Sequence, residues 1–182
     1  GSNTTLDMST FGLTLTGAIT NNGTLKTSST SNPPFTTTST SISGTVQFAA
    51  STGGQFVPAV TYNNLSLTNS SGNQTLNGNT RIQGTLTISS GGKLNTNGFS
   101  IPAVNAFSGT GQITGGSSFR MNITGSSGGT FYMDQATPLT TNRVKYLGLA
   151  ANATATLGNT TVVYGDTSYS GNVDLKSGSV LT

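Results

Sequence analysis

The sequence predicts an all-β fold, a parallel β-helix (β-solenoid) of short strands with Gly and Asn corners and little or no α-helix. Three observations support this prediction: part of the chain repeats itself, apolar and polar residues alternate over short stretches, and Gly or Asn separates these stretches. Repetition is typical of stacked architectures, whose units cannot bury their apolar side chains alone. An antiparallel sandwich or barrel also has many short strands, but its hairpins do not require successive units to resemble one another.

The repeat relates residues 62–94 to residues 144–181. The motif LTISSG at 86–91, for example, recurs as VDLKSG at 173–178. After its copy, the first unit continues as LNTNGFSI, and a similar continuation, LDMSTFGLTL, lies near the start of the chain. The second unit stops before any such continuation. The N-terminal part of the chain therefore contains a continuation of the kind that the C-terminal repeat unit lacks.

We expect one β-solenoid domain over residues 1–182. Its repeat-like units span about 62–116 and 144–182, and the sequence pattern of the second unit continues in residues 5–27, at the other end of the chain. Residues 28–60 form an irregular excursion, because they fall outside the repeat and contain Pro33-Pro34, which cannot donate ladder hydrogen bonds. With ~20–25 residues in each coil, the chain is long enough for about eight coils.

The expected strands are short, and in most of them apolar side chains share one face while Thr and Ser share the other. They are residues 12–16, 23–27, 41–48, 64–68, 80–89, 119–124, 130–133, 160–164 and 172–176. Gly and Asn between the strands provide the positive φ angles of tight corners. The expected corners are residues 22–23, 53–54, 77–78, 91–92, 97–98, 115–116 and 128–129.

The composition limits the possible partners. Apolar residues make up 32% of the chain, which alone suggests disorder, but their regular alternation indicates folded strands. The seven Lys and Arg residues are scattered, whereas a nucleic-acid surface needs clustered cations, so we expect no nucleic-acid partner. No run of about 18 or more apolar residues occurs, so we expect no membrane-spanning segment.

Side chains that carry out chemistry are few. The chain has no His, Cys or Glu, which excludes a Ser-His-Asp triad, a thiolate nucleophile and the usual zinc ligands. Among the four Asp residues, only Asp166 and Asp174 are close in sequence, where they could form an acid pair or a weak calcium site. One turn residue and one solvent-facing strand residue explain them better. We therefore expect no enzyme activity, no catalytic residue, no metal site and no cofactor.

Three motifs carry a family resemblance: YNNLSL at 62–67, LNGNT at 76–80 and GTLTISSGGKL at 84–94. This pattern resembles the repeats of secreted surface proteins and adhesins of Bacteroidetes-type Gram-negative bacteria. More broadly, it is similar to the β-helical stalks of filamentous haemagglutinin and autotransporter passengers. The resemblance covers residues 61–116 and extends more weakly to 144–182 and 5–27. It implies an exported, extracellular structural role at the cell surface, and it brings no catalytic residues with it.

Apolar residues near both ends of the chain predict self-assembly. The two end strands of a solenoid have unpaired edges, and we see no capping helix or charged guard at either end. We expect these faces to stack head to tail into a filament or adhesin fibre, with the chain itself as its partner. The boundary of a longer solenoid would look the same. The expected interface residues are Leu6, Met8, Leu13, Leu15, Val173, Leu175, Val180 and Leu181.

The alternative function is a binding module on the same scaffold, for surface polysaccharide or for ice. Exposed aromatic rings can stack on sugars, and the candidates are Tyr132, Tyr146, Tyr164 and Tyr169. Thr-x-Thr pairs, which bind ice when they stay in register on successive coils, start at Thr14, Thr85 and Thr154. Their spacing is irregular, so ordinary solvent-facing strand Thr is the simpler interpretation.

Overall fold

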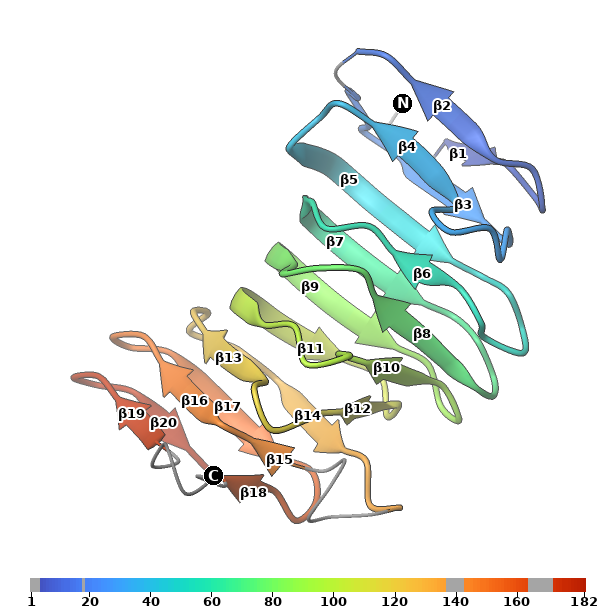
Figure 1. The fold of residues 1–182 in the computed structure, drawn as a ribbon. Helices are drawn as coiled ribbons and strands as arrows, with labels where there is room; N and C mark the ends of the chain where they lie inside the picture. Colours follow the sequence, from blue (N-terminus) through green and yellow to red (C-terminus); the bar gives the residue numbers. More distant parts are fainter. Residues whose placement is uncertain (1–3, 18, 137–142, 164–171) are drawn as a thin grey trace.

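The computed structural model describes residues 4–17, 19–136, 143–163 and 172–182, and within them it confirms the predicted β-solenoid. The chain winds into stacked coils from the N-terminal to the C-terminal end of the molecule (Figure 1). The strand pairings between the described residues are parallel, and none of these residues is helical. The self-similarity of the sequence therefore correctly predicts a solenoid and not an antiparallel sandwich.

The largest sheet has nine strands whose order in space follows their order in the sequence, as expected of a chain that adds one strand with each coil. These strands are β1 (Thr5–Asp7), β3 (Thr24–Thr27), β5 (Ser41–Phe48), β7 (Thr61–Leu67), β9 (Arg81–Ile88), β11 (Ile101–Ser108), β13 (Arg120–Ile123), β16 (Tyr146–Leu149) and β19 (Asn172–Leu175). We call it the first sheet.

A second sheet of seven strands follows the first around the coil. It contains β6 (Phe56–Val57), β8 (Asn73–Leu76), β10 (Lys93–Asn95), β12 (Gln112–Thr114), β14 (Thr130–Met133), β17 (Thr154–Leu157) and β20 (Val180–Leu181). Two further pairs lie outside these sheets: β2 (Leu13–Leu15) with β4 (Phe35–Thr37), and β15 (Arg143–Val144) with β18 (Val162–Val163).

Inward side chains of the first sheet stack in columns, because parallel pairing places equivalent residues of successive coils next to one another. One column consists of Leu6, Leu25, Val46, Leu65, Leu86 and Phe107. A second consists of Ile42, Tyr62, Ile82, Val104, Ile123, Leu149 and Leu175. In the middle of the chain these side chains are fully buried and form one continuous apolar core.

Residues 28–60 contain β4, β5 and β6 and contribute buried groups to this core, among them Phe35 and Phe48. Gln55, also buried, donates from Nε2 to the carbonyl oxygens of Thr27 and Ser29 at 3.1 and 3.0 Å. Gln74 on the next coil donates to Gln55 Oε1 at 3.3 Å. Stacked amides thus satisfy backbone groups inside the coil that would otherwise be buried without a partner.

Candidate functional site

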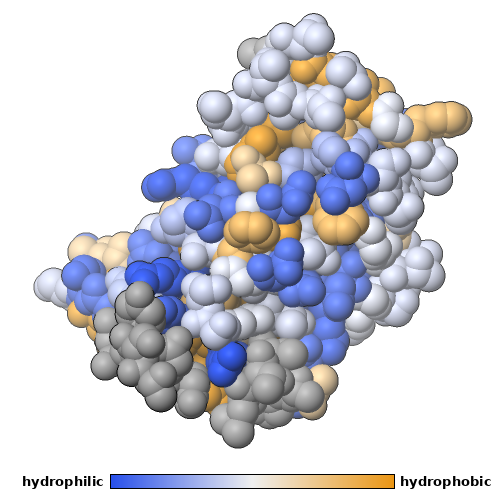
Figure 2. All heavy atoms as spheres, viewed as in Figure 1, coloured by the Kyte–Doolittle hydropathy of each residue, from blue (hydrophilic) through white to orange (hydrophobic). Residues whose placement is uncertain are grey.

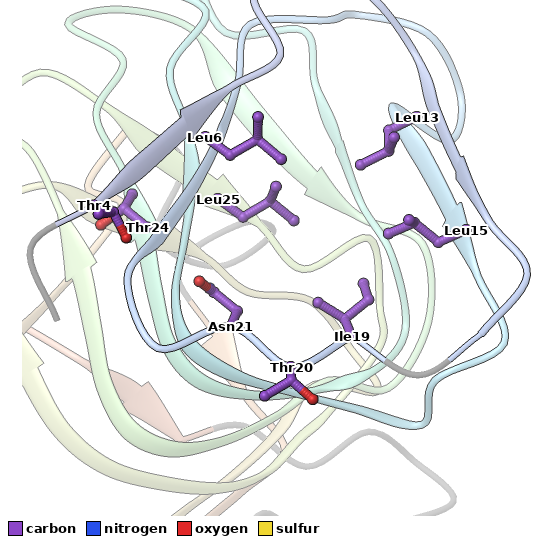
Figure 3. Close-up of a pocket in the computed structure, with 9 residues that line it drawn as sticks. All are labelled: Thr4, Leu6, Leu13, Leu15, Ile19, Thr20, Asn21, Thr24 and Leu25. Carbon is purple, nitrogen blue, oxygen red and sulfur yellow. The ribbon is translucent and has the colours of Figure 1, made fainter. Parts of the chain in front are cut away.

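The first coil leaves an apolar hollow open at the N-terminal end of the solenoid. Leu6 on β1 is 60% exposed, whereas Met8, just after β1, is buried and belongs to the core. Leu13 and Leu15 on β2 are half-buried and face Leu6 across the coil (Figure 3). The hollow has a volume of about 390 Å³ and is also lined by Ile19 and Leu25, which the sequence prediction did not include. Figure 2 shows apolar side chains gathered at this end of the molecule.

The last coil exposes apolar side chains in the same way. Val173 and Leu175 on β19 are 50% and 51% exposed, and they lie in register with the buried Leu147 and Leu149 of the coil before. Leu181 on β20 lies in register with the buried Ala155 and packs against the core. These three side chains therefore continue inward-facing columns.

Val180 differs from its neighbour Leu181. It lies in register with Thr154, is 50% exposed, and follows the alternation that turns every second side chain outward. The predicted interface residues thus fall into two groups in the structure. Seven of them lie on inward faces of the first or last coil, and Val180 lies on the outer surface of the last coil.

The strands at both ends also have unpaired edges. Among the described residues, β1 pairs only with β3, and β19 pairs only with β16. Each of these strands therefore has one edge of backbone N–H and C=O groups that meets no ladder partner in the described part of the chain. Both edges belong to the first sheet, so a further parallel strand could extend that sheet at either end.

The exposed apolar groups at the two ends belong to different columns. In β9, the column that ends in Leu6 passes through Leu86, whereas the column that ends in Leu175 passes through Ile82. Ile82 and Leu86 are four residues apart on the same strand. A second copy that brings Leu175 onto Leu6 must therefore shift along the strand direction relative to a straight continuation of the sheet.

Charged groups on the outer face of both end strands are paired within the chain. Lys26 Nζ lies 2.8 Å from Asp7 Oδ2, and this hydrogen bond, helped by the Ser9 N–H, lowers the pKa of Asp7. Lys176 Nζ lies 2.9 Å from Asp174 Oδ2, and its hydrogen bond is the largest cause of the lowered pKa of Asp174. Each end of the first sheet therefore carries one carboxylate and one ammonium group.

A third acid, Asp134, is nearly buried and joins three coils. Its side chain is 7% exposed and accepts hydrogen bonds from Lys93 Nζ at 2.8 Å, Thr114 Oγ1 at 3.0 Å and the Ala136 N–H at 3.0 Å. Burial raises the pKa of Asp134, but these hydrogen bonds outweigh burial, so the pKa lies below its usual value. Lys93 and Asp134 are 41 residues apart, so only the register of the coils shows that they meet.

The described residues contain no group of three or more potential metal-ligating side chains. Asp166, Tyr164 and Tyr169 lie outside the described residues. Asp174 pairs with Lys176 and also accepts a hydrogen bond from the Tyr146 hydroxyl at 2.9 Å. Over the described part of the chain, no helix has the length and apolar character needed to cross a membrane.

Threonine pairs do not repeat in register along the first sheet. Thr85 pairs with Ala106, and Thr87 lies between Ser66 and Ser108. The flat array of Thr-x-Thr pairs that the ice-binding alternative requires is therefore not formed around β9.

Comparison with protein-family models, with curated proteins and with solved structures gives no match.

Proposed function

We propose that this chain is a structural unit of an extracellular surface filament or adhesin fibre, in which solenoids stack end to end. The observation that carries the proposal is the exposure of inward-column side chains at both ends: Leu6 at the first coil and Val173 and Leu175 at the last. Another coil of the same kind can cover such a face, because a coil has both apolar side chains and a strand edge that can pair. The extracellular location rests on the resemblance of residues 62–94 to adhesin repeats.

The occupant that we propose for the N-terminal hollow is the last coil of a second copy. Its β19 would pair in parallel with β1, and Leu175 would cover Leu6 at the rim of the hollow. Since the two faces differ, the contact is heterologous and does not close on itself, so repetition gives a linear fibre.

The charges on the outer face favour one register of this contact. If Val173 lay opposite Leu6, Asp174 would lie opposite Asp7, and like charges directly opposite one another destabilise a sheet. If Leu175 lies opposite Leu6, Lys176 lies opposite Asp7 instead, and the carboxylate of Asp7 then has an ammonium group on either side. We therefore propose the register that pairs Leu175 with Leu6.

The test compares two lysine substitutions on the last coil. Leu175→Lys places a charge in the inward column and should leave the protein monomeric, whereas Val180→Lys, on the outer surface of the same coil, should assemble like wild type. Sedimentation velocity over a range of concentrations, followed by negative-stain electron microscopy, measures assembly, and circular dichroism checks that both variants fold.

Two results would contradict the proposal. In the first, Leu175→Lys forms the same oligomers as wild type. In the second, the wild-type chain stays monomeric at every concentration, which would mean that these faces are covered by something other than a second copy.

A further inference from the structure

A shallow groove lies on the outer face of the first sheet, among the strands nearer the C-terminus. End-to-end stacking does not explain it. It has a volume of about 430 Å³ and lies over the starts of β11, β13 and β16. Unlike the hollow at the first coil, it is lined mainly by polar and aromatic side chains. Its lining includes Asn79, Ser100, Pro102, Arg120, Asn122 and Tyr146.

The ring of Tyr146 is held against the sheet. A Cβ atom at Gly148 would lie 2.7 Å from Tyr146 Cε1 and 2.8 Å from its Oη, so the absence of a side chain at Gly148 lets the ring lie across the strand. Tyr146 Oη then donates a hydrogen bond to Asp174 Oδ2 on the next coil at 2.9 Å. The aromatic face is therefore positioned before any ligand binds, which reduces the entropy cost of binding.

Among the lining residues of the groove, Arg120 is positively charged and none is negatively charged. Arg120 is exposed and lies in register with Tyr146, and neither Arg120 nor Arg81 forms an ion pair among the described residues. Arg81 follows Thr80, whose N–H donates to the carbonyl oxygen of Ser100 in the groove wall. The nearest described carboxylate, Asp174, is already paired with Lys176 at 2.9 Å. The groove therefore favours an anionic ligand.

Amide groups add hydrogen-bonding capacity. Asn79 Oδ1 accepts the Ser100 N–H at 2.8 Å, which fixes the Asn79 side chain, while its Nδ2 has no hydrogen-bond acceptor among the described residues. Asn122 lies in register with Gly148, beside the ring of Tyr146. An aromatic face, amides and a guanidinium group side by side match a sugar, which has apolar C–H faces, hydroxyl groups and, in uronic acids, a carboxylate.

We propose that this groove binds an acidic, uronic-acid-containing polysaccharide, with the Tyr146 ring stacked on the C–H face of one sugar and Arg120 paired with its carboxylate. Because the groove is open along the outer face of the sheet, it accepts an extended polymer more readily than an enclosed small molecule. The proposal does not depend on end-to-end assembly, since the groove lies within a single chain.

Tyr132 provides a matched control. Its ring lies across Gly158, where a Cβ atom would be 2.3 Å from Tyr132 Cε1, much as Tyr146 lies across Gly148. Tyr132 belongs to β14 of the second sheet, however, and is not part of the groove. Replacing either tyrosine removes the same side chain from the same kind of strand environment.

The experiment measures binding of soluble polygalacturonate, with neutral dextran as the comparison, by isothermal titration calorimetry. Wild type should bind polygalacturonate and not dextran. Tyr146→Ala and Arg120→Gln should each weaken binding roughly tenfold or more. Tyr146→Phe, which keeps the ring, and Tyr132→Ala should stay within roughly twofold of wild type. Circular dichroism confirms that each variant is folded.

Lys26→Gln removes a cation from a distant part of the same sheet and tests for non-specific charge attraction. If it weakens binding as much as Arg120→Gln does, the groove is not the site. Unchanged binding by Tyr146→Ala, equal binding of dextran, or no binding of polygalacturonate by wild type would also overturn the proposal.

Discussion

The middle coils and the end coils are built from the same kinds of residue, yet they differ in how much of their apolar surface they bury. In the middle, β7, β9 and β11 are seven or eight residues long, and inward residues such as Leu65 and Leu86 are fully buried. At the ends, β1 and β19 have three and four residues, and Leu6 and Leu175 are more than half exposed. Burial in a solenoid thus comes from the neighbouring coils on both sides, and an end coil has only one neighbour.

The largest expected effect tests this difference directly. Leu65→Ala removes a fully buried side chain between two coils and should lower the free energy of unfolding by about 2–5 kcal/mol. Leu175→Ala, at the exposed end, should cost about 1 kcal/mol or less in the monomer. Urea unfolding of dilute protein measures both values. Equal losses for the two variants would show that the last coil is as well packed as the middle.

A smaller effect is expected at the corners of the middle coils. Gly109 has a φ of +82°, and a Cβ atom there would lie 2.1 Å from the carbonyl oxygen of Ile88, so Gly109→Ala should cost roughly 1–3 kcal/mol. The control is Gly17→Ala near the first coil, where nothing lies within 4 Å of the added carbon. Thermal unfolding compares the two variants, and a neutral Gly109→Ala would contradict the close packing of successive coils.

The third effect contrasts a buried acid with an exposed one. Asp134→Asn should lower the free energy of unfolding by about 1–2 kcal/mol at pH 7, because the buried hydrogen bonds to Lys93 and Thr114 lose their charge. Asp7→Asn should have a smaller effect, because solvent screens the exposed Asp7–Lys26 pair. The folded-state pKa of Asp134 lies below that of the unfolded chain. The contribution of the Asp134 carboxylate to the free energy of unfolding is therefore complete above the pKa of the unfolded state, about 4, and is lost as the pH falls through the pKa of the folded state.

Urea unfolding of wild type and Asp134→Asn at pH 7 and at pH 3 measures this contribution. The difference between the two proteins should shrink at pH 3. A constant difference would mean that packing around residue 134, not its charge, stabilises the three coils that it joins.

Much of the fold could be predicted from local patterns. Alternation over residues 41–48 and 80–89 matches β5 and β9, and the self-similarity of the chain indicated stacked coils. β11 could not be predicted in this way, because its sequence, IPAVNAFS, does not alternate regularly and its pairing with both neighbours is shifted by irregularities. Tertiary pairing, not local pattern, determines that strand.

The sites depend more heavily on register. The apolar residues at both ends were visible in the sequence, but the outward orientation of Val180 follows from its pairing with Thr154. Arg120, Tyr146 and Asp174 are separated by 26 and 28 residues, and they share one face only because the coils there are 26 residues long, against 19–21 near the N-terminus. A sequence without known coil lengths does not show that such residues meet.

The central claim is that the last coil of one copy covers the first coil of the next, with Leu175 opposite Leu6. The chain has no Cys, so single cysteines report this contact without interference. Opposed residues on adjacent parallel strands, about 4.8 Å apart, are close enough for a disulfide. Under mild oxidation, a mixture of Leu6→Cys and Leu175→Cys proteins should form a disulfide-linked dimer, whereas each variant alone should not. Dimers formed by either variant alone, or none from the mixture, would contradict the head-to-tail account.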